Sequence, residues 1–293
     1  MPVPPTTPAP TPSATPASWF VTGASRGLGL ELVRTLLQRG HRVSATTRSP
    51  QRLAEALVDV DTTQLLPLQV DLADERSVAG AVTAAVERHG RLDVVVNNAG
   101  YGFLGAVEET SDAEVRRMFD VQVFGTWNVL RSALPVMRRQ RSGHVVNVSS
   151  VLGLVAVPGW GAYCAAKWAL EGLTESLAGE VADHGITVSA VERGYFRTSF
   201  LSESVALPGT TTEGYEPIRE MVRAHLEMPG TQLGDPVRGA AAVVDLVSRG
   251  DARLRHLLGS DSHAYASAKV EALRADVEAS RAAARSTDFP SGS

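Results

Sequence analysis

From Trp19 onward, short apolar runs alternate with longer amphipathic segments of helical spacing. Such alternation is typical of βαβ units, in which each helix crosses back over a mostly parallel sheet. The apolar runs predict seven strands, over 19–23, 42–47, 65–70, 92–98, 144–149, 186–191 and 253–260. The sequence therefore predicts one doubly wound α/β domain, with helices on both faces of a seven-stranded parallel sheet.

Three regions fall outside this alternation. Residues 1–17 carry seven of the sixteen prolines and no charged side chain, so they cannot bury a core and we expect a disordered arm. Residues 200–235 mix Gly, Pro and Thr with scattered apolar side chains, which predicts a lid outside the sheet. An Ala-rich stretch over 263–285 predicts a surface helix. The expected organisation is an arm over 1–17, a folded domain over 18–260, and a C-terminal helix and tail over 261–293.

Composition argues against several classes of function. The net charge is -4, from 28 basic and 32 acidic residues without a long basic run, so we expect no nucleic-acid partner. Cys164 is the single cysteine, which excludes an intrachain disulfide and cysteine-pair zinc spacing, and we expect no metal. The uncharged stretch 145–166 holds polar residues, one proline and three glycines, so we expect no membrane span. Without a secretory signal, the expected location is the reducing cytoplasm.

A glycine-rich segment lies where the first strand should end and the first helix begin. Gly23, Gly27 and Gly29 permit a tight turn and let the backbone approach phosphates at the positive end of the helix. Three glycines alone could mark only a turn, but this placement favours a dinucleotide site. In this loop we expect cofactor contacts from Gly23, Ser25, Arg26, Gly27, Leu28 and Gly29.

The end of the second predicted strand bears on which dinucleotide binds. An NAD site usually places an acidic residue there for the ribose 2′-hydroxyl, but here Thr47 is followed by Arg48. Arg48 and Arg26 could together hold a 2′-phosphate, so NADP(H) is the predicted cofactor. The alternative is that both are solvated surface arginines. Further cofactor contacts are expected after the third and fourth strands, from Asp71, Leu72, Asn98, Ala99 and Gly100.

A second constellation predicts proton transfer. Tyr163 and Lys167 are four residues apart in a predicted helix and so share a face. An ammonium near a phenol favours the phenolate and lowers the phenol's pKa from about 10 toward neutral pH. This spacing is common by chance, but Ser150 lies thirteen residues upstream of Tyr163, at the end of the fifth predicted strand. Cys164 has no predicted base beside it, and we interpret it as a small buried hydrophobe.

Five motifs follow one another in register: T-G-A-S-R-G-L-G, V-D-L, N-N-A-G, the second Ser of N-V-S-S, and Y-C-A-A-K. Together they resemble the short-chain dehydrogenase/reductase superfamily in its single-domain, Rossmann-like form, over residues 19–259. The segments E-x-G-Y-F-R-T and L-L-G-S-D look most like the bacterial 17β-hydroxysteroid-dehydrogenase-like branch. The resemblance implies that Ser150 polarises a substrate carbonyl, Tyr163 transfers the proton, and Lys167 tunes the tyrosine and holds the nicotinamide ribose. Hydride then passes between the nicotinamide and the substrate carbon.

Two residues depart from the family's pattern. Gln122 stands at the family's fourth catalytic position, usually an asparagine that supports a water chain to the lysine. The resemblance therefore implies a catalytic role for Gln122, with the amide moved by one methylene. Arg193 stands where the family usually has proline beside the nicotinamide. A cation there would disfavour the positively charged oxidised nicotinamide; the alternative is that Arg193 points into solvent. Besides Tyr163 and Lys167, the resemblance implies cofactor contacts from Arg193, Gly194, Phe196 and Thr198.

These inferences predict one function and leave two alternatives open. We expect an NADP(H)-dependent oxidoreductase that interconverts a carbonyl and a secondary alcohol, mainly as a ketoreductase on a small or medium apolar substrate. One alternative, motivated by Gln122 and Arg193, is a non-redox lyase, isomerase or cofactor-sensing regulator on the same fold. The other is an interaction module, which only the proline arm supports. The family also implies a homodimer or homotetramer formed through the long helical segments 112–140 and 161–184.

Overall fold

A parallel sheet forms the centre of the molecule. The computed structural model describes residues 16–289, so nearly all of the arm predicted over 1–17 lies outside the described residues. Seven strands pair in the order β3-β2-β1-β4-β6-β7-β9. They are β1 (Ser18–Val21), β2 (Arg42–Thr47), β3 (Leu65–Gln69), β4 (Val94–Asn97), β6 (Gly143–Val148), β7 (Ile186–Arg193) and β9 (Arg255–Leu258). The predicted seven-stranded parallel sheet is confirmed.

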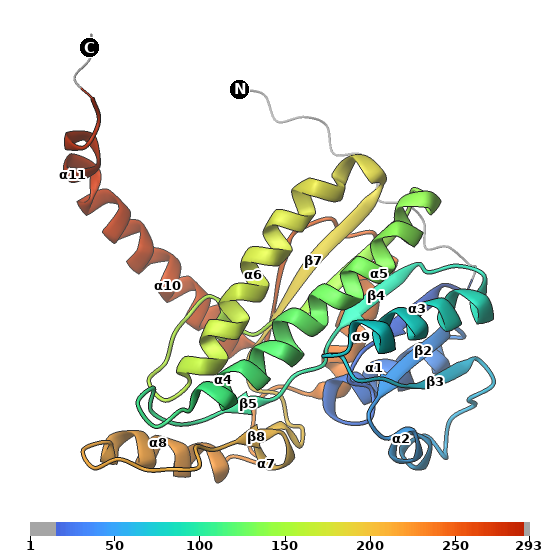
Figure 1. The fold of residues 1–293 in the computed structure, drawn as a ribbon, viewed down its shortest axis with the longest axis horizontal. Coiled ribbons are helices and arrows are strands. Elements are labelled where there is room, and N and C mark those ends of the chain that lie inside the picture. The colour runs from blue at the N-terminus through green and yellow to red at the C-terminus, as the bar shows by residue number, and fades with distance from the viewer. Residues whose placement is uncertain (1–15, 290–293) are drawn as a thin grey trace.

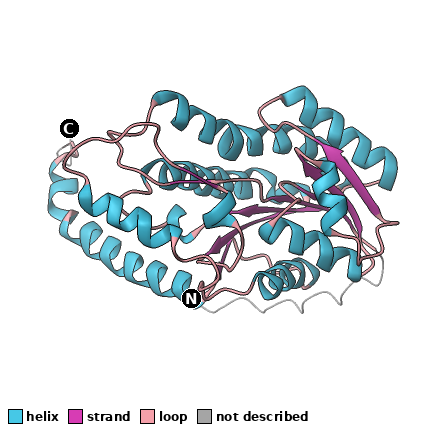
Figure 2. Cartoon of the chain, turned by 90° about the horizontal axis from the view of Figure 1, so that it is seen from below, coloured by secondary structure: helices cyan, strands magenta, loops and turns pink. Residues whose placement is uncertain are grey.

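Helices connect the strands and cover both faces of the sheet (Figure 2). They are α1 (Gly27–Gln38), α2 (Pro50–Ala56), α3 (Glu75–His89), α4 (Asp112–Phe119), α5 (Gly125–Gln140), α6 (Gly161–Val181), α7 (Phe200–Glu203), α8 (Glu216–Leu226), α9 (Pro236–Ser248), α10 (Ser260–Ala279) and α11 (Arg281–Ser286). Residues of α1, α2 and α9 share one buried cluster with the sheet. Residues of α3, α5 and α6 share a second cluster with it.

Alternate residues along a strand belong to different buried clusters, because they lie on opposite faces of the sheet. In β1, Trp19 and Val21 pack toward α1 and α9, whereas Phe20 packs toward α3 and α5. Successive strand side chains point to opposite faces, and here both faces are covered, so every position in β1 is buried. This is why strands such as β1 and β4 are nearly continuous apolar runs in the sequence rather than alternating ones.

The strand order places a cleft at one end of the sheet. The chain runs outward from β1 through β2 to β3 and then returns to β4 on the other side of β1. In open α/β sheets such a switch point opens a crevice at the carboxyl ends of the strands. Next to it, β5 (Gly102–Phe103) pairs in parallel with β8 (Val205–Ala206). This pairing joins the segment after β4 to the predicted lid, whose elements α7, β8 and α8 lie together at one end of the molecule (Figure 1).

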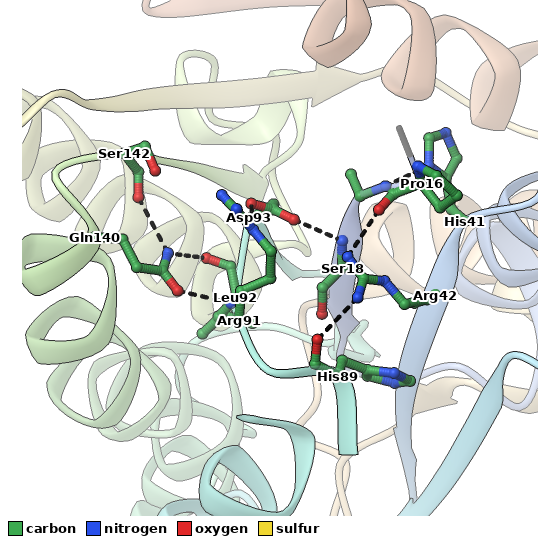
Figure 3. Close-up of polar contacts among 11 residues, drawn as sticks. Pro16, Ser18, His41, Arg42, His89, Arg91, Leu92, Asp93, Gln140 and Ser142 are labelled. Carbon is green, nitrogen blue, oxygen red and sulfur yellow. Dashed lines mark hydrogen bonds and ion pairs between the residues drawn. The ribbon is translucent and has the colours of Figure 1, made fainter. Parts of the chain in front are cut away.

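Polar contacts fasten the opposite, amino end of the sheet (Figure 3). Asp93 accepts a hydrogen bond of 2.8 Å from the backbone N–H of Ser18. The Arg42 guanidinium donates to the carbonyl oxygens of His89, at 2.9 Å, and Pro16, at 2.8 Å. Side chains at the starts of β2 and β4 thus satisfy backbone groups at the start of β1 and at the end of α3. They leave the carboxyl end free for the functional site.

The C-terminal helix begins earlier than predicted. It starts at Ser260, directly after β9, and the Ser262 hydroxyl donates 2.7 Å to the carbonyl oxygen of Glu192. Asp261 accepts 2.7 Å from the backbone N–H of Tyr195. The first turn of α10 is therefore tied to the end of β7, and Ala266 in the next turn is buried against the body. The later turns of α10, with α11, extend away from the body (Figure 1). No helix of residues 16–289 has the length and apolar character to cross a bilayer.

Candidate active site

A cleft of about 1090 Å³ lies at the carboxyl ends of the strands, beside the crossover between β1 and β4. It brings together most of the residues predicted for a cofactor, and Gln122 lies in its wall. These cofactor candidates are Gly23, Ser25, Arg26, Gly27, Leu28, Gly29, Arg48, Asp71, Leu72, Asn98, Ala99, Gly100, Tyr163, Lys167, Arg193 and Thr198. Arg48, Asp71 and Gly100 are exposed at its surface. The size of the cleft suits an extended ligand rather than a small metabolite alone.

The glycine loop has the backbone geometry of a phosphate cradle. Gly23 and Gly27 have φ values of 67° and 54°, a region that side chains disfavour. A Cβ on Gly29 would lie 2.3 Å from the carbonyl oxygen of Gly23, so only glycine fits there. The loop therefore lies directly against α1, whose N-terminal N–H groups are suited to bind an anion.

Asn98 holds this loop from the end of β4. Its amide nitrogen donates to the carbonyl oxygens of Thr22, at 3.0 Å, and Gly23, at 3.2 Å. The Thr22 hydroxyl accepts in return from the backbone N–H groups of Asn98 and Ala99, at 3.0 and 3.1 Å. The Asn98 side chain therefore positions the loop, and the chain from Asn98 to Gly100 lines the cleft.

An arginine cluster forms the rim of the cleft beyond β2. It contains the two predicted residues, Arg26 and Arg48, together with Arg52, which was not predicted. Arg52 lies in the first turn of α2, and its backbone N–H donates to Ser49, the N-cap, at 3.4 Å. The sequence did contain a signal for Arg52. Ser49-Pro50 is a typical helix start directly after β2, and it places the third helical residue, Arg52, near the end of that strand. Glu203 of the lid makes ion pairs with Arg26 and Arg52.

Three of the four predicted catalytic side chains lie near the inner end of the cleft. Ser150 follows β6 by two residues, while Tyr163 and Lys167 lie in the first two turns of α6, and all three are buried. The Ser150 hydroxyl accepts 3.2 Å from the backbone N–H of Leu152. The Lys167 ammonium donates 3.0 Å to the carbonyl oxygen of Val148 and lies 5.6 Å from the centroid of the Tyr163 ring.

The electrostatics of this group differ from the expectation that Lys167 lowers the tyrosine pKa. Burial raises the pKa of Tyr163, while Arg193 and the Ser150 hydroxyl lower it. Burial, aided by Arg193, lowers the pKa of Lys167 to about 7, and Glu171 opposes that shift. A lysine with this pKa is only partly charged at neutral pH. In the protein without cofactor, the cation that favours the phenolate is therefore Arg193.

Arg193 lies inside the site. Its guanidinium carbon is 4.8 Å from the centroid of the Phe200 ring, a cation–π distance. The Phe200 ring in turn packs edge-on against Tyr163, with centroids 6.0 Å apart. Arg193 lines the cleft and is partly buried, so the alternative in which it points only into solvent is wrong.

A smaller cavity of about 150 Å³ adjoins the cleft. Tyr163 and Arg193 line both spaces, and aromatic side chains dominate the smaller one. Its wall is formed by Ser150, Val151, Leu152, Val155, Val157, Trp160, Tyr163, Arg193, Gly194, Tyr195, Phe196, Phe200, Leu201, His225 and Tyr265. Tyr195 and His225 form a polar pair within it, with 2.8 Å between the phenol oxygen and Nε2. Neither residue was predicted for the site, because nothing in the sequence places the lid against β7.

Two predicted cofactor residues, Gly194 and Phe196, line the smaller cavity and not the cleft. A Cβ on Gly194 would lie 2.1 Å from a carboxylate oxygen of Asp261, so this glycine packs against the start of α10. Phe196 is buried next to Gly239, where an added Cβ would be 2.4 Å from the Phe196 ring. The chain after β7 therefore turns away from the cleft and returns to it at Thr198.

Gln122 occupies a π-helical turn over Asp120–Phe124, between α4 and α5. Its amide nitrogen donates 2.9 Å to the carbonyl oxygen of Tyr101. Its side-chain oxygen is buried and accepts no hydrogen bond from the described residues. Gln122 thus contributes an unpartnered acceptor to the cleft wall, and its contact is with Tyr101 rather than with Lys167.

Comparisons with known proteins agree with this geometry. The family model described as short chain dehydrogenase matches residues 18–207. The oxidoreductase BOA17 of Botryotinia fuckeliana is 35% identical over 261 residues, which cover 89% of this chain and 95% of that protein. A short-chain dehydrogenase structure from Streptomyces avermitilis aligns with a TM-score of 0.87 and 34% identity, covering 94% of this chain and all of that one.

A more distant structure carries a ligand. It is an alcohol dehydrogenase from the archaeon Thermococcus sibiricus, complexed with 5-hydroxy-NADP. The alignment has a TM-score of 0.69 and 26% identity, and it covers 83% of this chain and 96% of that one. From the family match, the relatives and the arrangement of the site, the protein belongs to the short-chain dehydrogenase/reductase superfamily and is an oxidoreductase of that type.

Proposed function

We propose that the protein is an NADP(H)-dependent carbonyl reductase that acts on apolar ketones. One observation carries the proposal: Tyr163 lies where a dinucleotide-sized cleft meets a small aromatic cavity. A proton donor at this junction faces the cofactor on one side and an apolar substrate on the other. The experiment that tests it is reduction of ketones by NADPH, followed as loss of NADPH absorbance.

The cleft fits an NADP(H) molecule. Gly23, Gly27 and the start of α1 would hold the pyrophosphate, since glycine at position 29 lets the loop lie directly against the helix N-terminus. The arginine cluster, formed by Arg26, Arg48 and Arg52, would hold the 2′-phosphate. The NADP analogue bound to the archaeal alcohol dehydrogenase supports this choice. When bound, the cofactor supplies the hydride.

The protein's own groups handle the proton and the carbonyl. Ser150 presents a hydroxyl at the wall of the aromatic cavity, where it would orient the substrate oxygen. The buried Tyr163 hydroxyl would give that oxygen its proton, and Arg193 would stabilise the phenolate left behind. The cavity wall is mostly aromatic and aliphatic, which favours an apolar ketone and excludes water.

Replacing Arg48 tests the choice of cofactor. We expect Arg48→Asp to weaken NADPH binding by about tenfold and to leave NADH affinity nearly unchanged, because a charge-assisted hydrogen bond contributes about 1.5–3 kcal/mol. Dissociation constants for both cofactors, measured by fluorescence titration, check this. Arg249→Asp is a matched control, since Arg249 is exposed at the end of α9. Equal affinity of the parent protein for NADPH and NADH would contradict the assignment.

Arg193 should favour the reduced cofactor. A unit charge close to the oxidised nicotinamide would cost a few kcal/mol at an effective dielectric of about 20, and less where water screens it. We therefore expect the parent to bind NADPH more tightly than NADP⁺, and Arg193→Pro to tighten NADP⁺ and speed alcohol oxidation. Arg193→Gln removes the charge without the constraint of proline. Titration of both redox forms decides the matter, and an unchanged ratio of dissociation constants in both variants would refute the charge effect.

A homo-oligomer remains part of the proposal. The helices for which the family implies dimerisation carry exposed aromatic side chains, with Trp127 on α5 and Trp168 on α6. Large exposed aromatic residues on neighbouring helices are typical of a surface that a second subunit covers.

A further inference from the structure

One acidic residue in the cleft contacts the arginine cluster that the proposed cofactor would use. Glu203 is the last residue of α7, in the lid, yet it lies in the cleft with the arginine cluster. Arg26 Nη1 is 3.5 Å from Glu203 Oε2, and Arg52 Nη2 bonds the same oxygen. Arg26 Nη1 also donates 3.1 Å to the backbone carbonyl oxygen of Glu203. The lid is thus held to the cofactor side of the cleft by two arginines.

The geometry of these contacts is that of an anion subsite. Arg26 comes from the glycine loop and Arg52 from α2, and both direct a guanidinium N–H at one carboxylate oxygen. Arginine side chains bind a phosphate oxygen in the same way, with two guanidinium groups around it. The hydrogen bond from Arg52 holds the pKa of Glu203 below its usual range. Glu203 therefore carries a full negative charge at neutral pH.

We propose that Glu203 is an internal occupant of the 2′-phosphate subsite, which the 2′-phosphate of NADP(H) displaces. The inference rests on NADP(H) being the cofactor. It adds that Glu203 competes with the 2′-phosphate for the arginine cluster. A carboxylate brings one charge and two oxygens, whereas a phosphate monoester brings about -1.5 to -2 charges and three oxygens. The phosphate is the stronger ligand for the arginine cluster, and repulsion between the two anions prevents them from sharing Arg26 and Arg52.

Displacement of Glu203 would also move the residues of α7 that line the substrate side of the site. This helix has four residues, so its two ends move together. Its first residue, Phe200, packs against both Tyr163 and Arg193, and the next, Leu201, lines the aromatic cavity. Binding of a 2′-phosphate therefore releases the contact that holds the lid over the cleft. Coupling of this kind is reciprocal, so an empty phosphate subsite favours the closed lid.

Two small probes isolate the 2′-phosphate. Adenosine 2′,5′-bisphosphate and adenosine 5′-monophosphate differ in that group alone, and neither carries a nicotinamide. Calorimetric titration of the full chain should show that Glu203→Gln tightens the bisphosphate by about fivefold, because two partly exposed ion pairs no longer compete. The monophosphate has no 2′-phosphate to compete with Glu203, so its affinity should change less than about twofold. Glu213→Gln, the same change at an exposed position of the lid, should alter neither.

A structural readout separates competition from a general gain in affinity. In the parent protein, hydrogen exchange over 199–206 should rise when the bisphosphate binds and should not rise with the monophosphate. In Glu203→Gln it should already be high without ligand. If the parent prefers the bisphosphate but Glu203→Gln binds it equally or more weakly, the competition is refuted while the NADP(H) assignment stands. If neither the parent nor Glu203→Gln prefers the bisphosphate to the monophosphate, both are refuted.

Discussion

Tyr163→Phe is expected to lower the rate of ketone reduction by NADPH by about 10²–10⁴-fold, which is the usual contribution of a positioned acid. The lost hydroxyl lies in a buried position between the cleft and the aromatic cavity. No other phenol lines both spaces among the described residues. NADPH affinity should stay within about twofold, since the ring that packs against Phe200 and Trp160 is retained. Single-turnover absorbance and fluorescence titration measure the two quantities.

Tyr215→Phe provides the matched control. The Tyr215 hydroxyl also makes a hydrogen bond, 2.6 Å to Glu108, but it lies in the lid outside both spaces. The control should retain the parent's rate. If Tyr163→Phe retained a rate close to that of the parent, another group would have to supply the proton, and the role given to Tyr163 would be wrong.

Lys167→Met should lose both turnover and cofactor affinity. Methionine keeps the length and bulk of the buried side chain but removes the ammonium. A charged hydrogen-bond donor contributes about 1.5–3 kcal/mol, so we expect NADPH to bind about tenfold more weakly or worse. Turnover should fall as well, because Lys167 lines the cleft beside Tyr163 and the loss of its ammonium disturbs the placement of the proposed cofactor. Both effects are measured with the same titration and single-turnover assay.

The pH dependence of NADPH binding gives a sharper test of Lys167. Burial lowers the pKa of Lys167 to about 7, so its ammonium is present below that pH and is lost as the pH rises through it. Affinity of the parent for NADPH should therefore fall from pH 6 to pH 8, and Lys167→Met should lack this dependence. Lys269→Met, on α10 and outside the lining of the cleft, should behave like the parent. An unchanged affinity in Lys167→Met at every pH would rule out the ammonium as a cofactor ligand.

The sheet and the cofactor loop were predictable because local sequence determines them. Strands buried on both faces need continuous apolar runs, as in β1 and β4. The turn at Gly23 and the close approach at Gly29 need glycine itself. Tyr163 and Lys167 share a helix, so their spacing alone places them on one face. In each case the physical requirement acts within a few residues of the chain.

The remainder of the site depends on contacts between distant segments. Glu203 contacts Arg26 and Arg52, which are 177 and 151 residues away in the sequence. No rule of sequence spacing predicts contacts over such separations. Gly194 and Phe196 follow the motif of the family, but packing against α9 and α10 directs them to the aromatic cavity. The pKa of Tyr163 depends on burial as well as on its neighbours. Tertiary packing decides these features.

The most direct test of the proposed function is a single-turnover assay of the parent protein with NADPH and a panel of apolar ketones. Because Tyr163 adjoins both the proposed cofactor cleft and the aromatic cavity, at least one ketone should cause a loss of NADPH absorbance that Tyr163→Phe does not show. A protein that binds NADPH tightly but oxidises none with any ketone would contradict the account. It would favour a non-redox lyase, isomerase or cofactor-sensing role on the same fold.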